Sequence, residues 1–441
     1  MILLPQRLLS VVEGGGMPHT RPHRIAMISM HTSPLASPGV GDAGGMNVYL
    51  AEVSRQLAAA GNEVDIFTRR TSAELADRQR LATGVQVHNI GGSEIASKEK
   101  NDLPEVLQNF TAGVLERAAE IPELRYDAVH AHYWLSGPVA QAVAPIWNVP
   151  IIASMHTLGA AKNLARQQPP EPAHRLRVEQ QLVEAADVLV ANTPAERQDL
   201  MLLTGADPER VLVVPPGVNH ESFHPGDQWA ARMQLGLPVD RRILLFVGRL
   251  QPLKGPDIVI RSVAELVRER PSLRNEVHLV VCGGPSGVGP GYLQELHELA
   301  MATGIADLVE FRPPATASRL VDLYRSADVL LMPSRSESFG LVALESQAAG
   351  TPVVAARVGG LTSSVAPGSS GLLVDGHDPV DWAAAIDRLL AQPELLAALT
   401  AGGLAHASQF DWSLTAAGLA AGYRRAIAGN GVDVVESANY E

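Results

Sequence analysis

The feature that most constrains the fold of this 441-residue chain is an alternation of short apolar runs with helix-length segments, which occurs twice. Such an alternation is typical of parallel sheets that helices cover on both faces. The pattern predicts an α/β protein with two doubly wound, Rossmann-like sheets. In the first half the strand-like runs are residues 24–30, 63–68, 85–90, 128–130, 151–154, 188–191 and 211–214. In the second half they are residues 243–247, 277–281, 309–312, 329–332 and 353–356.

Prolines and glycines at 215–217 and 225–226 separate the two patterns and indicate a domain boundary. We expect a disordered extension at 1–22, one Rossmann-like domain at 23–217 and a second at 218–411. Residues 412–441 should form a helix, at 412–428, that returns to the first domain, followed by a tail. Two sheets of this kind face each other across a cleft, which is a common place for a ligand.

The composition limits the possible partners. The chain has 35 basic and 47 acidic residues and a formal net charge of −12, which argues against nucleic acid or an anionic membrane surface. Its single cysteine, Cys282, excludes an intrachain disulfide and fits a reducing compartment. Residues 1–22 lack a signal-peptide pattern, and we find no run of eighteen apolar residues. We therefore expect a cytoplasmic protein without a membrane span.

Residues 328–360 hold a concentrated set of polar groups between two strand-like runs. A helix is expected at 339–349, with Glu337 at its mouth and Glu345 about two turns inside. Backbone N–H groups near Gly340 would favour phosphate, because they lie at a helix N-terminus. Carboxylates on both sides of an anion site suit a nucleotide-sugar. The alternative, a solvated loop charge at Glu337 and a surface residue at Glu345, stays open on this local pattern.

Two further segments follow strands and can bind anions. A glycine-rich loop at 37–47 links the first strand to the first helix, but it lacks the G-x-G-x-x-G fingerprint of dinucleotide sites. Arg249 and Lys254 follow the strand at 243–247, five residues apart. A guanidinium fork and an ammonium group that converge on one anion suit a diphosphate. Arg312 follows another strand, at the edge where a nucleobase would stack or pair.

Histidines stand at three strand ends of the first half. His31 follows the first strand, His130 and His132 follow another, and His156 follows the next. An H-x-H pair can suggest zinc, but its ligands would alternate across a strand, and no cysteine or H-E-x-x-H completes the site. We favour His156 as a hydrogen-bond donor to sugar or phosphate, with a structural histidine as the open alternative.

The chain resembles the retaining GT-B glycosyltransferases of family GT4. The resemblance covers about residues 23–428 and rests on the glycine-rich loop, G-R-L-x-P-x-K-G at 248–255, E-S-F-G-L-x-x-x-E at 337–345 and G-T-P-V-V-A at 350–355. Further segments are similar to members of the family that act on inositol 3-phosphate. They are residues 31–35, 41–49, 132–137 and 249–252.

The resemblance implies a UDP-N-acetylglucosamine donor and a 1D-myo-inositol 3-phosphate acceptor, joined in the first step of mycothiol biosynthesis. It implies a catalytic group of Arg249, Lys254, Glu337 and His156. The implied donor-binding residues are Ser37, Pro38, Gly45, Arg249, Lys254, Arg312, Glu337, Phe339, Gly340, Leu341 and Glu345. The implied acceptor-binding residues are His31, Asp42, Ala43, Gly44, Gly45, Met46, Asn47, Lys100, Tyr133, Thr157 and Arg175.

A peripheral Mg²⁺ and a homodimer are also implied. The metal would be held partly by backbone carbonyls, at Tyr324, Arg325, Ala327 and Thr351. Ser37 departs from the family pattern, since relatives often have glutamine there. No membrane or nucleic-acid partner is expected.

Double displacement would need a carboxylate nucleophile beneath the anomeric carbon, and no residue is a clear candidate. The expected route is front-face substitution, in which the departing UDP oxygen accepts the acceptor's proton. Three alternatives are a different acceptor such as a sugar phosphate or phosphatidylinositol, an isomerase similar to UDP-GlcNAc 2-epimerase, and an inactive binding protein.

Overall fold

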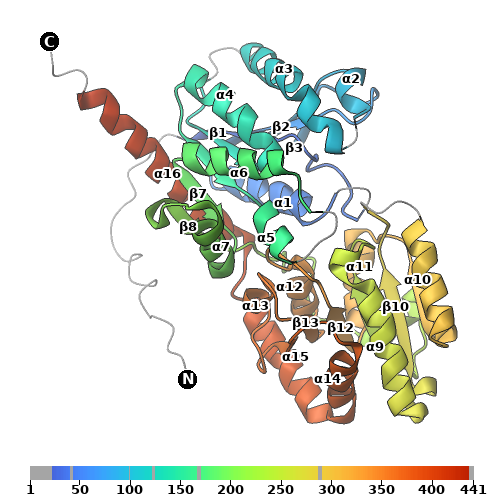
Figure 1. The fold of residues 1–441 in the computed structure, drawn as a ribbon. Coiled ribbons are helices and arrows are strands. Elements are labelled where there is room, and N and C mark those ends of the chain that lie inside the picture. The colour runs from blue at the N-terminus through green and yellow to red at the C-terminus, as the bar shows by residue number, and fades with distance from the viewer. Residues whose placement is uncertain are drawn as a thin grey trace, which may run out of the picture.

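The structure, a computed structural model, describes residues 22–39, 43–98, 100–121, 125–165, 170–286 and 291–436. Within these residues the chain forms two Rossmann-like sheets with helices packed around them (Figure 1), which confirms the predicted fold class. The predicted extension at 1–22 lies almost entirely outside the described residues.

The first sheet has the strand order β3-β4-β2-β1-β5-β6-β7-β8. Its strands are β1 (Arg24–Ser29), β2 (Glu63–Arg69), β3 (Arg78–Ala82), β4 (Val85–Ile90), β5 (Ala128–His132), β6 (Ile151–Ser154), β7 (Val188–Ala191) and β8 (Val211–Val213). The second sheet has the order β11-β10-β9-β12-β13-β14. Its strands are β9 (Arg242–Val247), β10 (Val277–Cys282), β11 (Val309–Arg312), β12 (Val329–Met332), β13 (Val353–Ala356) and β14 (Gly371–Val374).

All neighbouring strands are parallel except β3, which pairs with β4 in the antiparallel direction. The helices of the first half are α1 (Gly45–Ala59), α2 (Ser93–Ala96), α3 (Leu107–Ala119), α4 (Gly137–Trp147), α5 (Gly159–Leu164), α6 (Ala173–Ala185) and α7 (Pro194–Thr204). Those of the second half are α8 (Gln228–Leu235), α9 (Pro256–Glu269), α10 (Gly291–Ala302), α11 (Ala317–Ser326), α12 (Leu341–Ala348), α13 (Leu361–Ser364), α14 (Pro379–Ala391), α15 (Pro393–Ala407) and α16 (Trp412–Glu436).

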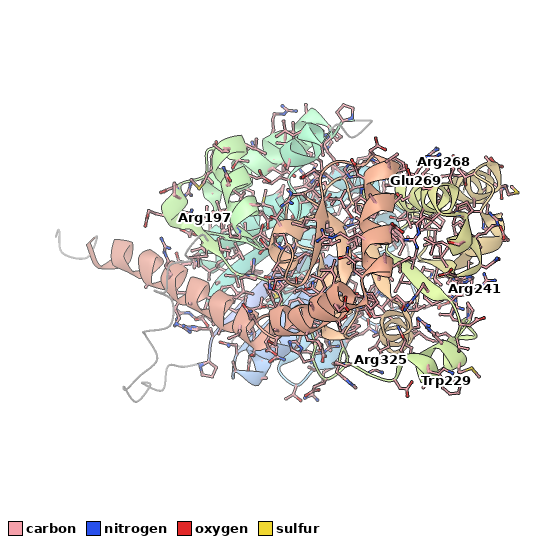
Figure 2. The ribbon with its side chains drawn as sticks, turned by 90° about the horizontal axis from the view of Figure 1, so that it is seen from below. Arg197, Trp229, Arg241, Arg268, Glu269 and Arg325 are labelled. Atoms are coloured by element: carbon pink, nitrogen blue, oxygen red, sulfur yellow. The ribbon has the colours of Figure 1, made fainter. Side chains whose placement is uncertain are left out.

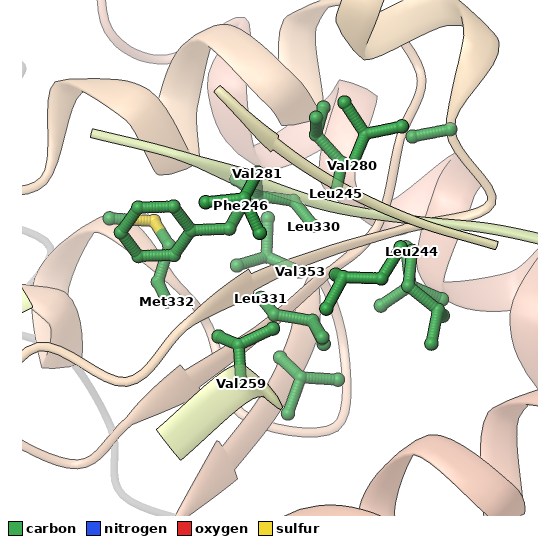
Figure 3. Packing of buried hydrophobic residues seen from close by; sticks show 14 of the residues in the cluster. Leu244, Leu245, Phe246, Val259, Val280, Val281, Leu330, Leu331, Met332 and Val353 are labelled. Atoms are coloured by element: carbon green, nitrogen blue, oxygen red, sulfur yellow. The ribbon is translucent and has the colours of Figure 1, made fainter. Parts of the chain in front are cut away.

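The core of the second sheet lies between β9, β10 and β12. Apolar residues from these strands, including Phe246, Val281 and Leu330, pack together with Val259 of α9 (Figure 3). Each is at most 2% exposed, and burying a side chain of this size contributes about 1.5–3 kcal/mol. This packing fixes the carboxyl ends of β9 and β12. The loops that carry Arg249 and Glu337 leave from those ends.

Helix α16 returns from the second sheet to the first, where it packs against α1 (Figure 1). Trp412, Ala416, Leu419, Tyr423 and Ala426 are buried there. Their spacing of three and four residues places them on one face of the helix. The helix ends at Glu436 rather than near 428 as predicted.

Arg268 and Glu269, at the end of α9, lie on the outside of the second half, and Figure 2 shows both away from the sheets. No helix in the described ranges is both long and apolar enough to cross a membrane.

Candidate active site

The two sheets present their carboxyl ends to each other, and two observations place the glycine loop against the second half. A Cβ atom built on Gly44 would lie 3.7 Å from Nε of Arg249. One built on Gly45 would lie 3.5 Å from Cδ1 of Leu341. Ligands of doubly wound sheets bind at such carboxyl ends. Predicted donor-binding and acceptor-binding residues therefore meet at this junction.

A hydrogen bond also crosses the junction. The Ser338 hydroxyl donates to the backbone carbonyl of His156, which joins the Glu337 loop to the end of β6. Helix α5, which begins three residues after His156, lies between the two halves in Figure 1. The predicted sugar-binding loop and the predicted acceptor site are thus in direct contact.

Glu337 is paired with one of the predicted diphosphate-binding residues. Its Oε2 lies 2.6 Å from Nζ of Lys254, and the two side chains are only 15% and 20% exposed. Ser334 adds a weaker hydrogen bond of 3.4 Å to the same oxygen. The alternative of a solvated loop charge at Glu337 is therefore wrong.

The loop of Glu337 is shaped by glycines. Gly340 has φ +99°, and a Cβ there would lie 2.7 Å from Cδ2 of Leu361. Because this left-handed residue precedes α12, the helix begins at Leu341, two residues later than predicted. The Gly360 N–H donates to the Glu337 carbonyl at 2.8 Å. Phe339 is buried at the helix mouth.

Glu345 is buried, so its alternative as a surface residue is also wrong. Its side chain is 8% exposed, and Oε2 accepts a 2.8 Å hydrogen bond from the Tyr324 hydroxyl. Burial raises the pKa of Glu345 to about 7, although the Tyr324 hydrogen bond opposes this. The carboxyl therefore titrates near neutral pH.

The predicted magnesium ligands do not fit a metal. The Tyr324 carbonyl already accepts hydrogen bonds from Oγ1 of Thr351 at 2.6 Å and from the Ala327 N–H at 3.1 Å. The Ala327 carbonyl accepts from Gln228, and the Arg325 guanidinium donates to the His224 carbonyl at 2.9 Å. Magnesium sites in proteins rely on carboxylates, and this set has none. Across the described part of the chain, no group of three or more His, Cys, Asp or Glu residues could hold a metal.

Three predicted acceptor residues gather around one guanidinium group. Arg175 lies over the Tyr133 ring, 5.0 Å from its centroid, and also near Trp134. Nη2 of Arg175 donates to the Thr157 carbonyl at 3.1 Å and to Oγ1 of the same residue at 3.3 Å. The His31 ring also contacts Tyr133, with 5.0 Å between centroids.

Arg175 itself is buried among carboxylates that the sequence analysis missed. It is 2% exposed and pairs with Glu171 at 2.9 Å and with Glu179 at 2.7 Å. Lys162 binds the other oxygen of Glu171. The spacing of four residues from 171 to 175 to 179 could have revealed the ion pairs.

Three histidines lie together at the ends of β5 and β6, and each has a hydrogen-bond partner. Nδ1 of His132 lies 3.0 Å from Nε2 of His156, and His130 bonds to Tyr423 at 2.8 Å and to Ser154 at 2.9 Å. Burial lowers the pKa of His130 to about 3 and that of His156 to about 4. These imidazoles are neutral at pH 7, so a contact between His156 and a ligand would be a hydrogen bond rather than a charge interaction.

The start of α1 is tied to the end of β1. The Gly44 N–H donates to Oδ1 of Asn47 at 2.8 Å, and Nδ2 of Asn47 donates to Oγ1 of Thr32 at 2.7 Å. Ala43 is buried beside them, and Met46 is half-buried. This fixes the glycine loop on the first sheet.

The remaining predicted site residues are exposed, bound to other groups or outside the described residues. Ser37 and Pro38 are exposed, in the segment before Gly39. The Arg312 guanidinium donates to Glu310 at 2.7 Å and to the Leu235 carbonyl at 2.8 Å. Asp42 lies outside the described residues, and the side chain of Lys100 does as well.

A surface cavity of about 660 Å³ lies elsewhere, between β4 and α3. Its arginines, Arg70 and Arg117, pair with Asp77 in the cavity wall. Because its cations are already neutralised, we assign it no part in this site.

Two family models match the chain. One, described as Glycosyltransferase Family 4, matches residues 43–222, and the other, described as Glycosyl transferases group 1, matches residues 227–404. Together with the paired sheets, the two family models define the protein as a glycosyltransferase with the GT-B fold.

The D-inositol 3-phosphate glycosyltransferase of Acidothermus cellulolyticus is 52% identical over 421 residues, which are 95% of this chain and 94% of that protein. The enzyme of that name from Thermobispora bispora is 52% identical and covers 92% of this chain and 96% of its own. The chain belongs to the family of D-inositol 3-phosphate glycosyltransferases.

Solved structures agree on the fold. Sucrose-phosphate synthase from Thermosynechococcus elongatus is 31% identical, with a TM-score of 0.84 over 92% of this chain and all of that one. The Anabaena protein HepE, solved with UDP and glucose, is 21% identical, with a TM-score of 0.72 over 90% of this chain and 98% of its own.

Proposed function

We propose that this protein transfers N-acetylglucosamine from UDP-GlcNAc to 1D-myo-inositol 3-phosphate with retention of configuration, as the first step of mycothiol biosynthesis. The Lys254–Glu337 ion pair at the junction carries the proposal, because it sets a diphosphate-binding cation beside a sugar-binding carboxylate. The names of the relatives support inositol phosphate as the acceptor. The UDP complex of HepE, a protein with this fold, supports a UDP-sugar donor.

Donor binding exchanges the partner of Lys254. Lys254 and Arg249 take the diphosphate, which carries more charge than the Glu337 carboxylate. Glu337 then becomes available to accept hydrogen bonds from sugar hydroxyls. Glu345 binds the ribose, and Arg312 lies near the uracil. The backbone N–H groups at the start of α12 add their dipoles to the phosphate site.

The reaction proceeds by front-face substitution. The departing UDP oxygen gains negative charge, which Arg249, Lys254 and the start of α12 stabilise. The same oxygen accepts the proton of the attacking inositol hydroxyl. His156, neutral and hydrogen-bonded to His132, orients the sugar by a hydrogen bond. We assign no step to magnesium, because the Tyr324 and Ala327 carbonyls already accept hydrogen bonds and the predicted set has no carboxylate.

The test is UDP release from UDP-GlcNAc with inositol 3-phosphate, free inositol or sugar phosphates as acceptor. We expect turnover with inositol 3-phosphate to exceed that with free inositol by at least tenfold. Equal rates with both would contradict the proposed phosphate site. The anomeric proton of the product, observed by NMR, reports retention or inversion.

We also propose that the enzyme acts in the cytoplasm as a homodimer. A single buried cysteine, Cys282, fits a reducing compartment. Sedimentation of the purified protein measures the oligomeric state.

A further inference from the structure

The arginine assigned to the acceptor phosphate is not open to a ligand in this structure. Arg175 is 2% exposed, and two carboxylates bind its guanidinium group. A phosphate can reach it only if one carboxylate leaves. Glu171 and Glu179 differ in how firmly they are held.

Glu179 is fixed in place. It is 2% exposed, and the Gly159 N–H donates to both of its oxygens, at 3.1 and 2.9 Å. Oε1 also accepts the 2.7 Å hydrogen bond from Nε of Arg175. Moving this carboxylate would leave two buried donors without an acceptor, which is costly. Glu179 therefore orients Arg175 and stays where it is.

Glu171 is the carboxylate that can leave. It is 18% exposed, and its oxygens bridge two cations, Lys162 and Nη1 of Arg175. Burial disfavours the charged form, but Lys162 and Arg175 outweigh it and keep the pKa of Glu171 below its usual value. The carboxylate is therefore an anion between an ammonium and a guanidinium group, the pair of donors that suits phosphate.

The surroundings suit a phosphate better than they suit a carboxylate. Thr157 Oγ1 lies 3.3 Å from Nη2 of Arg175, and the Tyr133 ring lies beneath the guanidinium. A phosphate has three acceptor oxygens and about −1.5 to −2 charge, so it can take the Thr157 hydroxyl as well as both cations. A carboxylate offers two oxygens and one charge.

We propose that Glu171 is an internal substitute for the acceptor phosphate and that Lys162 is a further phosphate-binding residue. The incoming phosphate displaces the Glu171 carboxylate from Lys162 and Arg175, while Glu179 keeps Arg175 in position. An acceptor without a phosphate cannot make this exchange, so Glu171 selects against free inositol. The identity of the acceptor as an inositol phosphate rests on the proposed function, whereas the exchange itself requires only a phosphate.

The first test measures inorganic phosphate binding by ³¹P NMR, with UDP present to fill the diphosphate site. We expect Glu171→Gln to bind phosphate about 3- to 10-fold more tightly, and Lys162→Met about tenfold more weakly. Glu265→Gln is the matched control, because Glu265 pairs with Arg268 on the second half of the chain. It should bind phosphate as the wild-type protein does.

The second test measures kinetics with UDP-GlcNAc and inositol 3-phosphate. The acceptor KM should fall in Glu171→Gln and rise in Lys162→Met by similar factors, with the donor KM unchanged. A purely structural role would shift the KM of both substrates together. Phosphate affinity that responds to neither substitution overturns the inference, even if the wild-type enzyme turns over inositol 3-phosphate. Shifted phosphate affinity without turnover would instead overturn only the proposed acceptor.

Discussion

The proposed donor and acceptor sides of the site each hold a cation against carboxylate, but in different ways. On the donor side, Lys254 pairs with the Glu337 carboxylate, and the two side chains are 20% and 15% exposed. On the acceptor side, Arg175 is almost fully buried, stacks on Tyr133 and pairs with two carboxylates. The donor pair can separate by rotation of two side chains. On the acceptor side, a phosphate can reach Arg175 only if one of its two carboxylate partners moves away.

Because of this difference, we expect substitutions on one side to affect mainly catalysis and substitutions on the other to affect mainly stability. The Lys254–Glu337 pair keeps some contact with water, so replacing Lys254 should cost less stability than breaking the fully buried pair of Arg175 and Glu179. Removing one partner of a buried pair leaves an uncompensated charge and destabilises the fold strongly. The donor side should therefore tolerate substitution structurally while losing activity. Substitution of Glu179 on the acceptor side should instead destabilise the fold.

Replacing Glu179 is expected to have the largest effect. Glu179→Ala leaves Nε of the buried Arg175 and the Gly159 N–H without an acceptor, which should cost about 3–5 kcal/mol of unfolding free energy. Urea denaturation measures it. Glu184→Ala, on the same helix α6 but exposed, is the control and should change stability by less than about 0.5 kcal/mol. Equal effects of the two would mean that Arg175 is not held as described.

Replacing Lys254 comes next. Lys254→Ala removes a cation from the departing diphosphate, and turnover should fall by about 10²–10³. The urea midpoint should move less than in Glu179→Ala, because the ion pair with Glu337 keeps some contact with water. Rates of UDP release at saturating substrates measure the loss. Near-normal turnover would show that Lys254 does not bind the diphosphate.

Part of this arrangement is predictable from sequence. The apolar runs of β9, β10 and β12 give the second sheet, because buried parallel strands are apolar throughout. Strand β3 was missed, since Arg78–Ala82 is mostly polar and lies at the antiparallel edge. Strand β14 was missed because it is short and begins with glycine. Sequence spacing correctly brings Lys254 near Glu337, as both follow neighbouring strands of one sheet.

Burial of charged groups could not be predicted. Nothing local shows that Tyr324, twenty-one residues away, covers Glu345, or that Arg175 faces inward from α6. Both depend on how helices pack against each other. The carboxylates at 171 and 179 have the spacing for ion pairs with Arg175, but the same spacing is common on solvated helix faces.

The pH dependence of Glu345 should be smaller than these losses. Its pKa is raised from 4.5 to about 7 in the folded protein, so between these values the folded state keeps a proton that the unfolded state has lost. Rising pH therefore destabilises the fold across this window, by at most about 1.4 kcal/mol per pH unit, with no further change above it. Glu345→Gln lacks this group. The stability of the variant relative to wild type should rise from pH 5 to 7 and then stay level.

Protonation of Glu345 should also weaken the binding of the donor. If Glu345 accepts hydrogen bonds from ribose hydroxyls, its protonated form binds them less well, and the KM for UDP-GlcNAc should rise as the pH falls below 7. The acceptor KM, measured in parallel, controls for general effects. A donor KM that is flat from pH 6 to 8 would remove Glu345 from the ribose site.

The smallest expected effect lies between the two sides. Ser338 donates to the His156 carbonyl, so it links the Glu337 loop to the residue that precedes Thr157. Ser338→Ala removes one hydrogen bond, worth about 0.5–1.5 kcal/mol, and should lower kcat/KM about 2- to 10-fold for donor and acceptor alike. Ser336→Ala, in the same loop, is the control. If only the donor KM changed, the bond would position Glu337 alone. A loss shared by both substrates would show that the two sides, although they hold their cations differently, depend on one contact for their alignment.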